Sequence, residues 1–155
     1  MKIVNLQDLP SCIETVARWH YREWGALYPG SDLSDFREDM EASLLTDLIP
    51  QTWVLAEGVR VWGSVSILKE DLPNYPEFSP WLANVYVEPS KRGHGYGQQL
   101  VKVAMGYARQ QNLGPLFLYT PDQVNFYEQL GWCTFHEDIY HGKTIFLMTN
   151  MPARV

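Results

Sequence analysis

The chain has 155 residues, of which 46% are hydrophobic, 14% aromatic and 19% charged. This length and composition predict one domain, residues 1–155, with a packed core, and they exclude a largely disordered chain. No apolar run approaches the roughly 18 residues of a membrane-spanning helix, and the first residues lack the apolar stretch of a secretory signal.

Charge and cysteine content narrow the class of protein further. Twelve basic residues against 18 acidic ones give a formal charge of -6. This sign is wrong for binding a nucleic-acid backbone; it is compatible with cationic substrates and is also common where acidity only provides solubility. Two cysteines are too few for a disulfide framework. We therefore expect a cytoplasmic protein that binds neither nucleic acid nor a membrane.

The N-terminal third predicts a strand followed by two helices. Residues 1–6 alternate as in a short strand. Ser11 and Glu14 form a capping-box pattern at the start of a helix that extends to about Gly25. A second helix is expected because its apolar residues recur on one stripe. Pro50 is expected to end it. These apolar residues are Phe36, Met40, Leu44 and Leu48.

The middle of the chain predicts three strands. Residues 51–57 and 60–69 are rich in Val, Ile and Trp and are joined at Gly58, which favours a hairpin. Residues 71–80 contain three prolines and are expected to form a surface loop. The third strand is expected at residues 81–87.

The remaining elements are a helix, a strand, a helix and a closing hairpin. The first helix follows the glycine-rich residues 93–97 and ends before Gly114. The other elements are expected at residues 116–119, 124–130, 132–140 and 143–149. The resulting order, β-α-α-β-β-β-α-β-α-β-β, predicts an α/β fold with a mixed sheet that helices flank.

The most informative segment joins the strand at residues 81–87 to the following helix. Glycines let a main chain approach a ligand closely, and the first turn of a helix offers unpaired N–H groups at the positive end of its dipole. The segment is therefore suited to bind a phosphate or diphosphate, with the Arg92 guanidinium at its edge. It reads Arg92-Gly93-His94-Gly95-Tyr96-Gly97-Gln98.

Two common phosphate-binding loops do not match this segment. A dinucleotide-binding G-x-G-x-x-G would need a glycine at Gln98 and would normally follow the first strand of the fold. A P-loop would need Gly-Lys-Ser/Thr, which the sequence lacks. A glycine turn that only lets the helix pack on the strand is the alternative without a ligand.

The segment resembles the diphosphate loop of the GCN5-related N-acetyltransferase (GNAT) superfamily, whose signature after a strand is Arg/Gln-x-x-Gly-x-Gly/Ala. Arg92, Gly95 and Gly97 occupy these places. A second run is similar to the F-Y-x-x-x-G-F/W element of the family. The resemblance covers residues 1–150 and implies a mixed, mostly antiparallel central sheet flanked by helices. The second run reads Phe126-Tyr127-Glu128-Gln129-Leu130-Gly131-Trp132.

The resemblance also implies a co-substrate, acetyl-CoA. No metal is expected, because Cys133, His136 and His141 do not share one face of a strand and have no apparent fourth ligand. Backbone amides of residues 92–98 would hold the diphosphate of acetyl-CoA. Main-chain groups of Val85 and Val87 would bond the pantetheine arm as if it were a further strand, in a gap beside the neighbouring strand. One of these amides would polarise the thioester carbonyl. The side chains of both valines can at the same time belong to the sheet core.

Tyr127 is the candidate catalytic side chain that the resemblance implies. Direct transfer requires an amine to attack the thioester and a thiolate to leave, and a phenol can protonate or hydrogen-bond that thiolate. The alternative role of Tyr127 is packing against the cofactor. Many family members have asparagine seven residues before this tyrosine, where this chain has Thr120, which puts that cofactor contact in doubt.

No general base is assigned from the sequence. Glu70 and Asp71 are candidates, whereas Glu88 is expected to face solvent. The acceptor pocket is expected to be built from the first two helices, the loop between them and residues 71–80. Aromatic residues of this region suit its walls, although at helical spacing they fit a core equally. These residues are Trp19, His20, Tyr21, Trp24 and Trp53.

The resemblance thus implies an acetyl-CoA-dependent N-acetyltransferase that transfers an acetyl group directly to a primary amine of a small molecule or peptide. The alternative is a non-catalytic acyl-CoA-binding sensor or assembly module with the same fold. Homodimers are common among relatives, but the sequence does not locate an interface.

Overall fold

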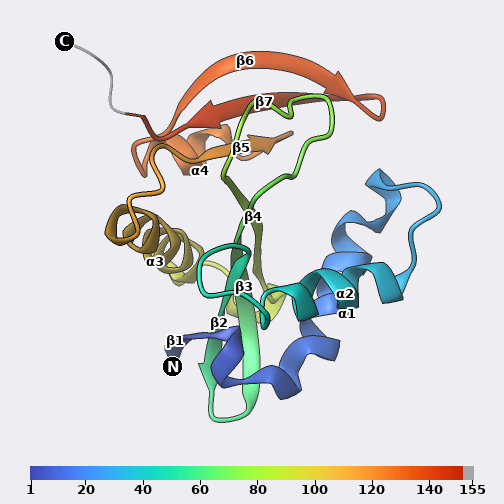
Figure 1. Cartoon of the computed structure of the whole chain (residues 1–155), viewed down its shortest axis with the longest axis vertical. Helices are drawn as coiled ribbons and strands as arrows, with labels where there is room; N and C mark the ends of the chain where they lie inside the picture. Colours follow the sequence, from blue (N-terminus) through green and yellow to red (C-terminus); the bar gives the residue numbers. More distant parts are fainter. Residues whose placement is uncertain (152–155) are drawn as a thin grey trace.

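A seven-stranded mixed sheet lies between two layers of helices (Figure 1). The structure is a computed structural model that describes residues 1–151. The strand order is β1-β2-β3-β4-β5-β7-β6, and each neighbouring pair is antiparallel except β4 and β5. The predicted α/β fold and its element order are confirmed. The strands are β1 (Lys2–Asn5), β2 (Gln51–Glu57), β3 (Arg60–Leu68), β4 (Trp81–Val87), β5 (Phe117–Thr120), β6 (Cys133–Tyr140) and β7 (Lys143–Thr149).

The helices divide between the two faces of the sheet (Figure 1). Helices α1 (Ile13–Trp24) and α2 (Leu33–Ala42) cover one face, and α3 (Tyr96–Gln110) and α4 (Val124–Glu128) cover the other. In β2, Leu55 packs in the core that contains α3, and its neighbour Val54 packs in the core that contains α1. Because successive strand residues point to opposite faces and helices cover both faces, β2 is buried on both sides from Gln51 to Ala56.

A third apolar cluster lies beneath the loop between β3 and β4. Leu72 of this loop packs with Trp81, Ile145 and Leu147, all at most 3% exposed. This cluster holds the loop against β4 and β7. Within residues 1–151, no helix has both the length and the apolar character needed to cross a membrane.

The predicted capping box at the start of α1 is wrong. The residue that caps this helix is Cys12, which makes no side-chain capping bond. Glu14 instead bonds Arg18 at 3.2 Å and Arg37 of α2 at 2.7 Å. The Glu14 carboxylate therefore binds arginine side chains in place of the main-chain N–H that the capping-box pattern predicted.

Helix α2 ends well before Pro50, contrary to the prediction. It begins at an unpredicted capping box between Asp32 and Asp35 and ends at Ala42. The Ser43 carbonyl then accepts a hydrogen bond from the Gln7 side chain at 2.9 Å. The Gln7 side chain therefore satisfies the carbonyl of Ser43, which a longer helix would have bonded to one of its own N–H groups.

Candidate active site

A gap opens in the sheet between β4 and β5. The two strands run parallel and are paired only at Trp81 and Phe117, next to a 3.0 Å bond from the Phe117 N–H to the Pro80 carbonyl. On its other edge, β4 stays paired with β3 as far as Val87. Beyond Trp81, one edge of β4 therefore faces β5 without the ladder of hydrogen bonds that closes a sheet.

A β-bulge interrupts β4 beside this gap. Two residues, Asn84 and Val85, stand opposite the single residue Val65 of β3. Asn84 has a φ of 58°, a backbone conformation that residues other than glycine seldom adopt. Bulges bend a strand and redirect its groups, and they are frequent next to active sites.

Buried polar side chains hold the bulge in place. The Ser64 hydroxyl donates to the Asn84 carbonyl at 2.7 Å, and Ser64 Oγ lies 2.8 Å from His20 Nε2. Asn84 Nδ2 donates to Ser66 Oγ at 3.1 Å, which in turn bonds the Thr52 hydroxyl at 2.8 Å. Burial lowers the pKa of His20 to about 3, so the neutral ring donates through Nε2–H to Ser64. These side chains are positioning residues for the bulge.

The main-chain groups of Val87 are directed toward the gap. Glu88 N–H donates to the Trp62 carbonyl of β3 at 2.8 Å. Because alternate residues of a strand direct their N–H groups to opposite edges, the N–H of Val87 points away from β3, and that of Val85 does the same. The Val87 carbonyl accepts from Arg92 Nε at 2.7 Å. This orientation is the one that the predicted contacts of Val85 and Val87 require.

The glycine loop combines two different uses of glycine. Gly93 and Gly95 have φ angles of 85° and 79°, and a Cβ at either position would meet no atom within 4 Å. Their outer side is therefore open, and the first turn of α3 starts directly after Gly95. Gly97 differs, because its Cβ would lie 3.3 Å from the Phe126 ring. The two sequence motifs are thus in contact with each other.

The other loop residues surround this open side without closing it. The exposed Arg92 places its guanidinium 5.6 Å from the Tyr86 ring and, through its bond to Val87, ties the loop to the end of β4. The rings of His94 and Tyr96 lie 6.0 Å apart. Because His94 and Tyr96 alternate with the glycines, their rings lie beside the open side of the loop.

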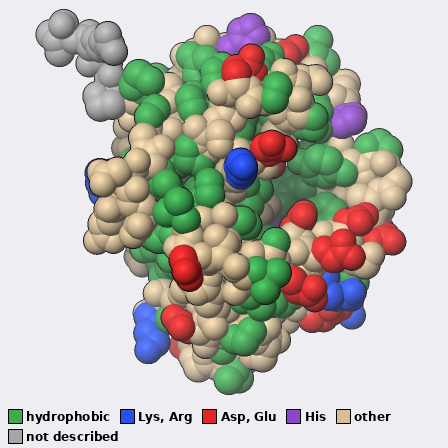
Figure 2. Space-filling model, in the orientation of Figure 1, with side chains coloured by type: hydrophobic (Ala, Val, Ile, Leu, Met, Phe, Trp, Pro, Cys, Tyr) green, Lys and Arg blue, Asp and Glu red, His purple; other side chains and the backbone are tan. Residues whose placement is uncertain are grey.

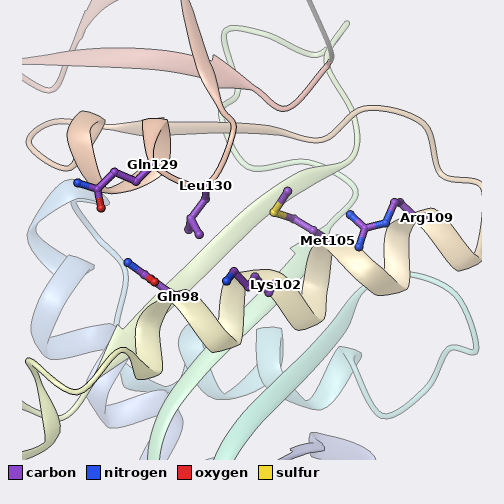
Figure 3. Close-up of a pocket in the computed structure, with 6 residues that line it drawn as sticks. All are labelled: Gln98, Lys102, Met105, Arg109, Gln129 and Leu130. Carbon is purple, nitrogen blue, oxygen red and sulfur yellow. The ribbon is translucent and has the colours of Figure 1, made fainter.

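An open cavity of about 420 Å³ lies between α3 and α4, next to the glycine loop (Figure 3). Its α3 residues recur three or four positions apart and form one stripe, which Lys102 and Arg109 make cationic. Sequence analysis missed both residues, although basic residues on the helix after a phosphate loop are a readable signal. The lining residues are Gln98, Lys102, Met105, Arg109, Gln129 and Leu130.

Helix α4 places Tyr127 in the core on this same face of the sheet. Tyr127 is 9% exposed, and its ring lies 5.0 Å from that of Phe126 and 6.1 Å from that of Trp132. Burial raises the pKa of Tyr127, and the charge of Asp122 raises it further. The phenol is therefore protonated, which is the form that can donate a hydrogen bond or a proton.

The opposite face of the sheet presents a different set of groups. The hydroxyls of Tyr28 and Tyr119 lie 2.9 Å apart, and Asp71 follows β3 nearby. Burial and the charge of Asp39 raise the pKa of Asp71 to about 7. Figure 2 shows that the surface on this side is hollowed, with hydrophobic side chains in the hollow and acidic side chains gathered over α1 and α2 at its rim.

A comparison with known protein families decides the identity of this arrangement. The sequence model described as "Acetyltransferase (GNAT) family" matches residues 13–132, which include the glycine loop and α4. The chain belongs to the GNAT acetyltransferase family. Within residues 1–151 of this GNAT protein, no group of three or more His, Cys, Asp or Glu side chains could hold a metal ion.

Solved structures share the fold of this GNAT chain at low sequence identity. Aminoglycoside 6'-acetyltransferase type Ii superposes with a TM-score of 0.71 at 18% identity, covering 99% of this chain and 100% of its own. A Salmonella typhimurium protein solved with its cofactor acetyl-CoA gives a TM-score of 0.68 at 18% identity, covering 100% of this chain and 96% of its own.

One curated relative matches part of the sequence. Mycothiol acetyltransferase from Rhodococcus erythropolis (strain PR4) is 33% identical over 73 residues, which are 43% of this chain and 24% of the relative. The GNAT chain therefore spans only about a quarter of this relative.

The structure separates the two roles left open for the aromatic residues. Trp19, His20 and Trp53 belong to the core and not to a pocket wall, because all three are buried, and Trp53 packs on the α3 side of the sheet, 5.0 Å from the Tyr107 ring. Thr120 stands where many GNAT members have asparagine. Its hydroxyl accepts a bond from the Gln123 N–H at 3.0 Å and thereby organises the turn into α4.

Proposed function

We propose that this GNAT protein is an acetyl-CoA-dependent N-acetyltransferase. It would transfer the acetyl group directly to a primary amine of a small molecule or peptide while both substrates are bound. The observation that carries this proposal is the gap between β4 and β5, which the glycine loop and α3 border at one end. A gap in a sheet offers an extended ligand main-chain partners along its whole length.

The groups around the gap fit the chemistry of acetyl-CoA. The open amides of residues 93–98 suit a diphosphate, and Lys102 and Arg109 add positive charge in the adjoining cavity. The N–H groups of Val85 and Val87 suit the amides of the pantetheine arm. The Salmonella typhimurium structure with acetyl-CoA and an aminoglycoside 6'-N-acetyltransferase with coenzyme A have the same fold, which supports this assignment.

Tyr127 would stabilise the sulfur that leaves when the amide forms. Burial keeps its phenol protonated, so a hydrogen bond to the developing thiolate is available without a prior proton transfer. The raised pKa makes full proton transfer less favourable. Tyr127 would therefore act first as a hydrogen-bond donor and then as the source of the thiol proton.

The test is turnover with acetyl-CoA and a panel of primary amines, followed by the release of free thiol and by mass spectrometry of the product. We expect thiol release with at least one amine and a product heavier by one acetyl group. Tight acetyl-CoA binding without thiol release across the panel would instead favour the binding-module alternative, and no binding at all would contradict both. We also place the protein in the cytoplasm, and sedimentation tests whether it forms a homodimer, as many relatives do.

A further inference from the structure

The structure separates the three carboxylates that are candidates for the general base. Glu70 is exposed. Glu88 lies beyond the far end of β4, 3.6 Å from Arg22 and away from the point where β4 and β5 are paired. Asp71 is half-buried beside Leu72, which is 3% exposed and belongs to the apolar cluster around Trp81. Only Asp71 of the three combines restricted access to water with a place near the start of the gap.

Packing places Asp71 close to three tyrosines. Its neighbour Leu72 belongs to the apolar cluster against which Tyr119 of β5 and Tyr140 of β6 pack, and the hydroxyl of Tyr28 lies 2.9 Å from that of Tyr119. In agreement with this position, the charge of Asp71 contributes, after burial, to raising the pKa of all three tyrosines. The charge of Asp39 of α2 in turn helps to raise the pKa of Asp71.

This cluster adjoins the point where β4 and β5 part. Tyr119 lies two residues after Phe117, the last residue of β5 paired with β4, and its ring is 6.3 Å from that of Trp81. Tyr119 and Trp81 pack on the face opposite to Tyr127. The segments that supply the cluster border the hollow in Figure 2, on the side of α1 and α2. An acceptor in the hollow would thus reach the gap from the side opposite to the cofactor cavity.

We propose that Asp71 binds the ammonium group of a cationic acceptor in this hollow and takes the proton that the nitrogen must lose before it attacks. This proposal rests on the acetyltransferase function proposed above and names its acceptor class and its base. The pKa of about 7 suits the role, because about half of the carboxylates are ionised at neutral pH and accept a proton readily.

The step balances in protons and bonds. The ammonium group carries three hydrogens: one goes to Asp71, one remains on the amide, and one restores to Tyr127 the proton that its phenol gives to the thiolate of coenzyme A. The freed nitrogen lone pair forms the bond to the thioester carbon, and the carbon–sulfur bond breaks with its electron pair on sulfur. The proton on Asp71 then leaves to solvent through the hollow.

The charges around the hollow favour an acceptor with a second positive charge. Helix α2 carries four acidic residues, and its basic residue, Arg37, bonds Glu14 of α1 at 2.7 Å. Asp39 is the member of this group that acts on Asp71. A diamine is therefore expected to be a better acceptor than an amine that carries a carboxylate. The acidic residues are Asp35, Glu38, Asp39 and Glu41.

The test compares Asp71→Asn with the neighbouring control Glu70→Gln, each as the full chain. The wild type is expected to acetylate 1,4-diaminobutane at least tenfold more efficiently in kcat/KM than 4-aminobutanoate. Its kcat/KM should rise with pH up to about 7. Asp71→Asn should lose about 100-fold in kcat and lose this pH dependence, because its residual rate no longer requires an ionised Asp71. Glu70→Gln should retain both.

Each other outcome has a defined meaning. Wild-type kcat and pH dependence in Asp71→Asn would overturn this proposal while leaving the acetyltransferase function intact. Equal use of the two acceptors would overturn the proposed acceptor class. If the wild type turns over no amine, the proposed acetyltransferase function is wrong. Calorimetry with 1,4-diaminobutane then tests the ammonium site alone. Equal binding by wild type and Asp71→Asn would overturn that site. The melting temperature at pH 8 shows whether Asp71→Asn is folded. We expect it to equal or exceed that of the wild type, because the substitution removes a destabilising buried charge.

Discussion

The two faces of the sheet meet at one gap but carry opposite charge. On the α3 and α4 face, loop amides, Lys102 and Arg109 form a positive surface next to the gap. On the α1 and α2 face, Asp71 and the acidic residues of α2 supply negative charge, and the charge of Asp39 helps to raise the pKa of Asp71. The difference shows how two substrates of opposite charge can approach one reacting centre from opposite sides, each attracted to its own face. The formal charge of -6 averages over both surfaces and conceals this division.

A substitution of Tyr127, on the α3 and α4 face, should have the largest effect. In Tyr127→Phe, the hydrogen bond to the leaving thiolate is lost, while the ring and its packing remain. We expect kcat to fall by about 100-fold, with the dissociation constant of acetyl-CoA changed by less than about threefold. Steady-state kinetics together with calorimetric titration of acetyl-CoA measure both. An unchanged kcat would remove the catalytic role and leave Tyr127 as a packing residue.

A substitution on the α3 face should change cofactor affinity alone. In Gly95→Ala the new Cβ enters the open space where the diphosphate would contact the loop, which should weaken acetyl-CoA binding by about 30-fold through lost charge-assisted hydrogen bonds. Gly114→Ala is the matched control, because Gly114 also has a positive φ, 78°, and no atom within 4 Å of its Cβ position. Both variants bear the same backbone strain.

The control separates strain from ligand contact. Gly114→Ala should lower the melting temperature about as much as Gly95→Ala and leave acetyl-CoA binding unchanged. Equal loss of affinity in the two variants would mean that the loop does not contact the cofactor. The KM for the amine should be unaffected in both, because the acceptor lies on the other face.

The smallest effect is a pH dependence of stability in which His20 and Asp71 oppose each other. His20 has a lowered pKa in the folded state, so between pH 6.5 and about 4 only the unfolded state binds its proton, and stability falls as pH falls. Asp71 has a raised pKa, so over this range only the folded state binds its proton, and stability rises as pH falls. In the wild type the two contributions nearly cancel.

Removing Asp71 should expose the contribution of His20. Relative to wild type, the free energy of unfolding of Asp71→Asn should decrease by about 1.4 kcal/mol for each pH unit below 6. His20→Asn should show the opposite change relative to wild type. Urea unfolding at pH 4.5, 5.5 and 6.5 measures these slopes. Parallel curves for all three proteins would contradict the protonation states assigned to both groups.

Sequence patterns predicted the parts of the molecule that local order determines. Strand β4 and the glycine loop were located correctly because alternation, helical spacing and a strand–glycine–helix order are visible within a few residues. Even the contact between the two motifs had a visible cause, since Gly97 is the small residue that admits the Phe126 ring.

The region of the acceptor pocket was predicted, but the groups that meet there were not, because they come from distant positions. The Tyr28–Tyr119 pair joins positions 91 residues apart, and neither residue belongs to a motif. Glu70 and Asp71 are equivalent as sequence, and only the packing of Leu72 separates an exposed carboxylate from a half-buried one. Trp53 remained a candidate for the pocket wall because the sequence does not reveal which face of β2 it occupies.

The most direct test of the account is a crystal structure of the protein with coenzyme A and 1,4-diaminobutane. We expect the diphosphate against the amides of residues 93–98, the pantetheine arm between β4 and β5 beside Val85 and Val87, and the diamine next to Asp71 on the side of α1 and α2. A diphosphate bound away from the glycine loop, or both ligands on the same side of the sheet, would contradict it.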